Sequence, residues 1–154
     1  MRIFGFEICS YKPIIFGDLI AKQFVLFEHK KLFGIIFFYF KGNKQDRFHT
    51  HAFNALSIKL FGKYKEGILT HRSPDKVYVR YETRNKIFKY FPRDCYHSIN
   101  ESTGCMTVLF QGPWKKTWKE CKLEQTILDE TYPMLEGTKK IVEETTLTWH
   151  RQII

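Results

Sequence analysis

Two histidines one residue apart, His49 and His51, stand at the start of an apolar run rich in β-forming residues that ends at Gly62. Side chains alternate between the two faces of a strand, so this spacing predicts that both imidazoles lie on the same face. Such a pair can chelate zinc, iron, nickel or copper, but two ligands seldom hold an ion firmly. The rest of the chain must therefore fold so that a third ligand reaches this strand.

The candidate for that third ligand is His97, which follows the turn-forming residues Pro92 and Asp94. Two alternatives stay open. The histidines could be ordinary surface or core residues, and Cys95, which by alternation shares the face of His97, could supply a thiolate ligand or be a small buried residue.

The first histidine segment resembles the first motif of the cupin superfamily. That motif has His-x-His, then a glutamate three or four residues on, then a glycine six residues later. His49 and His51 match the histidines and Gly62 matches the glycine, whereas Ala55 stands where the glutamate would be.

The segment around His97 resembles the second cupin motif, Pro-x-Gly-x-x-His followed by an asparagine. Pro92 and His97 match in spacing, Asp94 replaces the glycine, and Asn100 falls one residue early. The histidine triad of the family is thus present and its glutamate is not.

This resemblance implies an all-β fold, the double-stranded β-helix or cupin jelly roll. It also implies that a divalent metal, Fe, Mn, Zn or Ni, is held by His49, His51 and His97. Three protein ligands would leave open positions for water or substrate, as expected of a catalytic site.

The chain also resembles a small group of uncharacterised bacterial and phage cupin-like proteins over residues 46–120. The shared features are His-x-His-x-aromatic, Gly-x-Tyr-x-Glu, and a Gly-Pro strand end with a following tryptophan. They are carried by His49, His51 and Phe53; by Gly62, Tyr64 and Glu66; and by Gly112, Pro113 and Trp118. This resemblance implies the fold and brings no known reaction with it.

Candidate catalytic residues are Tyr64 and Glu66, which share a face with Gly62 by alternation. On that face Glu66 would lie near the ion and replace the absent motif glutamate. The alternative is a solvent-facing carboxylate between Lys63 and Lys65. The predicted ligand-binding residues, which would line or wall an apolar pocket, are Phe53, Gln111, Trp114 and Trp118.

Composition agrees with one β-rich globular domain over residues 1–154. The chain is 44% hydrophobic and carries 15 Phe and 8 Tyr, which pack well on a pleated sheet. The longest apolar run, Leu32 to Phe40, is too short to span a bilayer and predicts a buried strand. We find no secretory signal and expect a cytoplasmic protein without a membrane partner.

A formal net charge of +9 raises the question of a nucleic-acid partner. The lysines are scattered, however, and no basic helix or block emerges. We therefore expect a small-molecule ligand and a solvated lysine-rich surface, with nucleic acid as the less favoured partner. A homodimer stays open.

Local patterns predict a few elements in more detail. Apolar residues at helical spacing predict a helix over 16–30, so we expect one or two short helices beside the sheet. Strands over 77–82 and 86–91 are predicted to form a hairpin.

Two main function classes follow from these features. The first is a metal-dependent enzyme, of dioxygenase, isomerase or lyase type, that acts on a small molecule. The second is a non-catalytic cupin that captures a small ligand. The basic charge adds a weaker third class, a nucleotide- or nucleic-acid-linked role.

Overall fold

The computed structural model describes residues 2–3, 6–16, 19–43, 47–72, 77–125 and 138–148. Its strands are β1 (Arg2–Ile3), β2 (Phe6–Phe16), β3 (Leu19–Glu28), β4 (Gly34–Asn43), β5 (Phe48–His49), β6 (Ala55–Phe61), β7 (Tyr64–Arg72), β8 (Val77–Thr83), β9 (Phe88–Phe91), β10 (His97–Gln111), β11 (Thr117–Gln125) and β12 (Thr138–Thr148). The predicted all-β fold class is confirmed. Within the described ranges there is no helix at all, and hence none that could cross a membrane.

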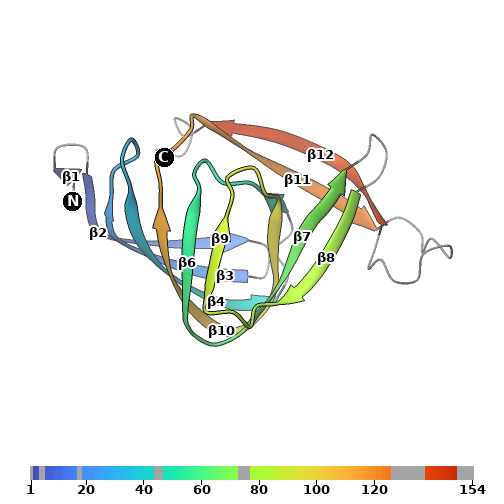
Figure 1. Cartoon of the computed structure of the whole chain (residues 1–154), viewed down its shortest axis with the longest axis horizontal. Helices are drawn as coiled ribbons and strands as arrows, with labels where there is room; N and C mark the ends of the chain where they lie inside the picture. The colour runs from blue at the N-terminus through green and yellow to red at the C-terminus, as the bar shows by residue number, and fades with distance from the viewer. Residues whose placement is uncertain are drawn as a thin grey trace.

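One curled antiparallel sheet contains all twelve strands (Figure 1). The order along its main path is β1-β2-β3-β4-β10-β5-β11-β12-β8-β7, and an additional pairing joins β7 back to β10. The path from β10 through β5, β11, β12, β8 and β7 is therefore a closed ring of strands. This closure wraps the sheet around an interior space, as a jelly roll does.

Strand β10 joins the closed ring to the strands outside it, which are connected to β10 through β4 and β6. From Glu101 to Gln111 it pairs with β4, and at its start His97 pairs with His49 of β5. On its other edge the first half pairs with β7 and the second half with β6. Irregular register around Ser102–Cys105 allows β10 to bend between these two partners. The start of β10, at His97, consequently lies inside the closed ring.

The predicted helix over 16–30 is wrong, because Leu19–Glu28 forms strand β3 and Phe16 ends β2; residues 17 and 18 lie outside the described residues. Leu19, Ala21 and Val25 are buried while Ile20 and Phe24 are exposed, which is the period-two burial of a strand. The spacing that imitates a helix arises because apolar residues lie on both faces of this strand, with Leu19 buried and Ile20 and Phe24 exposed.

The predicted hairpin over 77–82 and 86–91 is also wrong, although both strands exist. Strand β8 pairs with β7 and β12, whereas β9 pairs with β6. The connection between them carries Arg84, which is 4% exposed and points into the protein. A buried arginine fixes this connection as a crossover between two parts of the sheet instead of a turn.

Strand β4 is apolar on both faces, as its sequence predicts. Ile36, Phe38 and Phe40 face the interior, and the alternate residues Ile35 and Phe37 face outward. The interior residues of β4 and β10 belong to two apolar clusters, one around Val25, Ile36 and Leu109 and one around Leu19, Tyr64, Ile99 and Cys105.

Candidate metal centre

The segment that carries His49 and His51 is held inside the ring by strands on both sides. Strand β5 covers only Phe48–His49, and the chain continues in an extended form until β6 begins at Ala55. The Thr50 backbone N–H donates to Lys119 O (2.8 Å), and the His51 N–H donates to Arg93 O (3.0 Å). The predicted continuous strand is therefore interrupted, but the two imidazoles still project to the same side.

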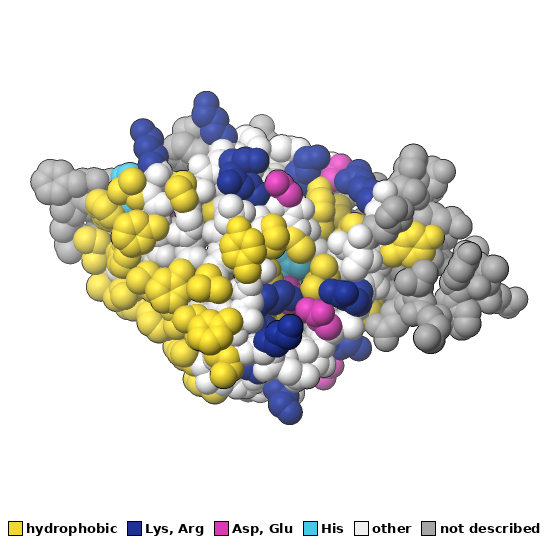
Figure 2. All heavy atoms as spheres, viewed as in Figure 1, with side chains coloured by type: hydrophobic (Ala, Val, Ile, Leu, Met, Phe, Trp, Pro, Cys, Tyr) yellow, Lys and Arg dark blue, Asp and Glu magenta, His cyan; other side chains and the backbone are white. Residues whose placement is uncertain are grey.

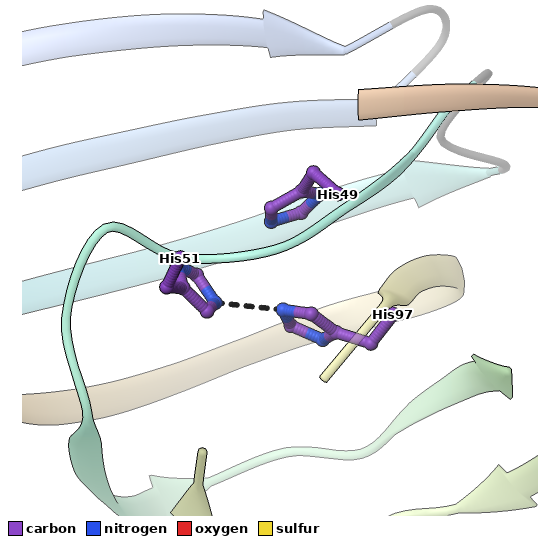
Figure 3. Close-up of side chains that lie close together, drawn as sticks. All are labelled: His49, His51 and His97. Atoms are coloured by element: carbon purple, nitrogen blue, oxygen red, sulfur yellow. Dashed lines mark hydrogen bonds between the residues drawn. The ribbon is translucent and has the colours of Figure 1, made fainter. Parts of the chain in front are cut away.

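The third histidine comes from the neighbouring strand, because His97 is the register partner of His49 across β10 and β5. The ring centroids of the three histidines are 4.7 to 5.1 Å apart. One nitrogen from each ring lies within 4.8 Å of the others, and His51 Nε2 is 2.7 Å from His97 Nε2 (Figure 3). The predicted convergence of the three histidines is confirmed.

The environment keeps two of these imidazoles neutral. Burial lowers the pKa of His51 to about 3, with a further contribution from His97, and burial and the other two histidines hold the pKa of His49 well below its usual range. A neutral imidazole presents the lone pair that a metal ion needs. His49 and His51 are thus in the protonation state of metal ligands.

The three nitrogens fit a metal ion after a small opening. Two nitrogens bound to zinc at about 2.0–2.1 Å with tetrahedral angles are roughly 3.3 Å apart. The 2.7 Å contact between His51 and His97 is a hydrogen bond in which one Nε2 donates and the other accepts. An ion that replaces this shared proton would need His51 and His97 to separate by about half an ångström.

A buried carboxylate orients His97 from behind. Glu66 is fully buried, which excludes the solvent-facing alternative, and its Oε1 accepts a hydrogen bond of 2.6 Å from His97 Nδ1. A proton on Nδ1 leaves Nε2 unprotonated and directed at the other histidines. Among the described residues Glu66 is not one of the clustered ligands; it has the geometry of a carboxylate that fixes the tautomer of a ligand.

The charge of Glu66 is balanced by Lys89 on β9. Lys89 Nζ lies 2.5 Å from Glu66 Oε2 and 3.0 Å from Glu82 Oε1. Burial alone would raise the pKa of Glu66, but the hydrogen bonds from His97 and Lys89 and the positive charge of Lys89 outweigh it and hold the pKa below its usual range. The carboxylate is therefore ionised behind the cluster.

Tyr64 is held by a buried arginine. Arg84 Nη1 donates to the Tyr64 hydroxyl (2.7 Å) and to Ser57 Oγ (2.9 Å), while Nη2 donates to Ser57 O (2.8 Å). Burial, followed by the nearby Glu66, raises the pKa of Tyr64. The phenol stays protonated and its own O–H can donate a hydrogen bond.

The histidines open onto a cavity of about 1150 Å³. Its apolar wall includes Phe38, Phe40, Leu109 and Phe91, and it also contains four predicted site residues and Tyr64. Those four are Phe53, Gln111, Trp114 and Trp118. An interior of this size is not packed solid around the histidines, and it is large enough for a small organic molecule.

The aromatic residues of the cavity form a continuous path away from the histidines. His51 stacks with Phe53 (5.3 Å between centroids), Phe53 contacts Trp114 (5.0 Å), and Trp114 meets Trp118 edge-on (6.2 Å). Lys30 Nζ lies 4.0 Å from the Trp114 ring centroid. The rings of Phe53 and Trp114 thus connect the histidine cluster to Lys30 in the β3–β4 turn.

Gln111 lies at the far end of this path with a partner that the sequence did not suggest. Its Nε2 donates to Glu28 Oε1 (2.6 Å), and both side chains are buried. Gln111 Oε1 and Trp114 Nε1 have no hydrogen-bond partner among the described residues. The cavity lining thus contains buried polar groups in addition to the histidines.

Sequence reasoning missed Glu28, Arg84, Lys89 and Phe91, because their roles depend on which strands pair. Phe91 packs 4.9 Å from the His97 ring, and β9 brings it there through β6. For Lys89 and Phe91 the sequence does carry one signal, their spacing of two residues, which places both side chains on the same face of a strand. Cys95 does not join the nitrogen cluster found within the described ranges, so its thiolate alternative gains no support.

Comparison with solved structures identifies the fold. The chain is similar to oxalate decarboxylase from Bacillus subtilis, with a TM-score of 0.50, 12% identity, and coverage of 74% of this chain and 30% of that one. It is also similar to an RmlC-like cupin from Shewanella frigidimarina (TM-score 0.48, 13% identity, 70% and 86% coverage) and to CapF from Staphylococcus aureus (0.46, 15%, 68% and 31%).

The chain has the cupin fold, as its motifs predict. It spans about 30% of the length of the oxalate decarboxylase chain. At this level of identity the likeness concerns the fold alone. No protein-family model matches the sequence, and comparison with curated proteins gives no match.

Proposed function

We propose that this protein binds a divalent metal ion through His49, His51 and His97 and is a metal-dependent enzyme that acts on a small molecule. The observation that carries the proposal is the convergence of three imidazole nitrogens within 4.8 Å at the wall of a cavity of about 1150 Å³. Iron, manganese, zinc and nickel all accept such a ligand set. An ion with three protein ligands keeps positions for a substrate or water.

A bound ion would supply Lewis-acid chemistry, or oxygen activation if it were iron. The residues of the chain would do the rest. Glu66 holds His97 in the tautomer that presents Nε2, and the Phe53 and Phe91 rings pack against the His51 and His97 rings. Tyr64, protonated and fixed by Arg84, would donate a hydrogen bond to an oxygen of the substrate.

A second candidate is a non-catalytic cupin that captures a small ligand. It is favoured by the absence of a carboxylate from the ligand cluster in the described part of the chain, where Ala55 occupies the position of the motif glutamate. The one buried carboxylate near the cluster, Glu66, is already engaged by His97 and Lys89. A general base for turnover would then have to be another carboxylate of the cavity, such as Glu120, which lines it and is the register partner of His49.

Metal binding is tested by titrating chelator-treated protein with Fe²⁺, Mn²⁺, Zn²⁺ and Ni²⁺ in a calorimeter. We expect one saturable site per chain, lost in His51→Ala and kept in His29→Ala, which removes a cavity histidine outside the cluster. Absence of saturable binding, or equal loss in both variants, would contradict the proposal.

Turnover is tested separately with the metal-loaded protein. Small organic acids, including dicarboxylates and aromatic acids, would be screened first for stabilisation in a melting assay and then for product formation or oxygen uptake. Product that depends on the metal and disappears in His51→Ala supports the enzyme. Ligand stabilisation without product supports the binding protein.

A further inference from the structure

The outward face of the sheet that surrounds the cavity is apolar over five strands, β3, β4, β10, β6 and β9. On β10 and β4 the inward residues line the cavity, so Phe110 and Phe37, which alternate with them, point outward. Figure 2 shows this surface as a continuous hydrophobic area on the side of the molecule where β10 and β6 run. We call these outward side chains the outer sheet face.

Strand register arranges the outer sheet face in rows. One row runs across all five strands through Phe24, Phe37, Val108, Ile58 and Phe88. The next row runs across four strands through Ile35, Phe110, Leu56 and Tyr90. Cross-strand neighbours are about 5 Å apart, so each row is an unbroken apolar ridge.

Neither row contains a charged residue. A third row, Lys22, Tyr39, Met106 and Phe61, has a single lysine, and Lys22 lies on β3 at one side of the face. The charges of β6 and β9 are turned away from it, since Lys59 and Lys89 make their contacts with Arg84 O and with Glu66. The chain has a net charge of +9, yet Lys22 is the single charged residue in these three rows.

The exposed area is larger than a monomer usually leaves in water. Eight residues of the face or its border are 39% to 61% exposed: Phe24, Leu26, Leu56, Leu60, Phe61, Phe88, Tyr90 and Phe110. At about 150–250 Å² for a large side chain, they expose on the order of 700–800 Å². The largest apolar patch of a typical monomer covers about 300–600 Å², and a stable interface buries about 800 Å² on each partner.

We propose that the outer sheet face is the interface of a homodimer, with a second copy of this chain as its occupant. An uncharged sheet surface made of parallel ridges is complementary to another surface of the same kind. Two such sheets pack face to face about 10 Å apart, with the ridges of one interleaved between those of the other. A twofold arrangement presents the same rows to each other and buries both faces at once.

The position of this interface leaves the metal centre independent of it. The cavity and the histidines lie on the inward side of the same strands. Dimer formation therefore buries the apolar outside without closing the cavity by itself, and variants on the outside separate assembly from metal binding.

The test is the mass of the full chain in solution, measured by sedimentation or light scattering from low micromolar to about 100 µM. Wild type is expected to have twice the monomer mass at the upper concentrations. Phe110→Lys, in the centre of the face, and Tyr90→Lys, on β9, should each shift the protein to monomer. The control Leu32→Lys adds the same charge at a 51% exposed leucine of the β3–β4 turn and should stay dimeric.

Folding of each variant is verified by circular dichroism and by retained metal binding. If Phe110→Lys does not fold, Tyr90→Lys decides, since Tyr90 is 59% exposed and its replacement removes little packing. A wild-type chain that is monomeric at all concentrations would overturn the proposal. So would a dimer that neither substitution weakens, or a monomer that binds lipid vesicles through this face.

Discussion

At the residue scale, the candidate site is defined by a carboxylate that does not touch the ion position. Glu66 lies between His97 and Lys89, and each of its oxygens accepts one hydrogen bond. A ligand histidine whose other nitrogen is fixed in this way keeps its orientation and becomes more basic. The metal affinity of the site therefore depends on a residue outside the ligand set.

We predict that Glu66→Gln lowers divalent-metal affinity by about 10- to 100-fold, because it removes the negative charge that polarises His97. Calorimetric titration with Zn²⁺ or Mn²⁺ measures the change. The matched control is Glu82→Gln, which contacts Lys89 on its outer side and should leave the affinity unchanged. Equal affinities for wild type and Glu66→Gln would show that the carboxylate only fills space.

A second prediction concerns the pH dependence of stability without metal. The pKa of His51 is about 3 in the folded chain and about 6.5 when unfolded, so the unfolded state takes up the proton first as the pH falls. The free energy of unfolding should therefore decrease from about pH 6.5 towards pH 3, by up to roughly 1.4 kcal/mol per pH unit from this histidine.

Urea unfolding of chelator-treated protein at pH 7, 6 and 5 measures this slope. In His51→Gln the dependence should be shallower than in wild type, since one proton-binding group is removed from the unfolded state. Parallel slopes for wild type and His51→Gln would contradict the prediction.

The sequence predicted most of these residues because strand alternation needs no knowledge of the fold. The spacing of His49 and His51, and the Gly62, Tyr64, Glu66 series, place side chains on a face whatever the neighbours are. Arg84 and Glu28 could not be found in this way. Their partners, Ser57 and Gln111, are 27 and 83 residues away. The pairing of β6 with β9 brings Arg84 to Ser57, and the pairing of β4 with both β3 and β10 brings Glu28 to Gln111.

At the element scale, the β6–β7 turn has a requirement that its motif glycine satisfies. Gly62 has a φ of +80°, and a Cβ built on it would lie 2.0 Å from Gly104 O of β10. Both the backbone conformation and the contact with a neighbouring backbone exclude a side chain. The turn therefore closes tightly on the bulged part of β10.

We predict that Gly62→Ala destabilises the protein by at least about 2 kcal/mol or prevents folding, since the clash is with backbone that cannot move aside. Gly112→Ala is the control. Its added Cβ would meet only Asn54 O at 3.5 Å, an ordinary contact, and should change stability by less than about 0.5 kcal/mol. Urea unfolding of both variants gives the difference, and equal stabilities would show that β10 can retreat from the turn.

The two incorrect element predictions share one cause. Residues 16–30 and 77–91 were interpreted from local patterns, and in both segments the outcome depends on partners elsewhere. Strand β3 is fixed by pairing along both edges, with β2 and with β4. Strands β8 and β9 separate because buried Arg84 needs acceptors on β6 and β7, which a tight turn would not provide.

At the scale of the whole molecule, the cupin fold followed from two motifs even though most strand pairings did not. The motifs mark the two segments that must meet, β5 and the start of β10, and a sheet that joins them across about 50 residues has to curl. The strand order and the apolar outer sheet face depend on the full set of pairings. No local pattern contains that information.

The last prediction links the metal to the stability of the whole fold. A ligand that binds only the folded chain stabilises it by RT ln(1 + [L]/Kd), or about 2.7 kcal/mol at a concentration 100 times Kd. For a chain of this length each kcal/mol raises the melting temperature by about 2–4 °C. Saturating metal should therefore raise it by roughly 5–10 °C, and a chelator should reverse the shift.

The ligands come from β10 and from the segment that begins at β5, so an ion would join two parts of the ring that are otherwise held by few backbone hydrogen bonds. His97→Ala should therefore lose the shift, while His29→Ala keeps it. Protein concentration must be the same in every sample, because self-association through the outer sheet face would itself change the melting temperature. An equal shift in His97→Ala would mean that the metal acts at another site and that the cluster is not its ligand set.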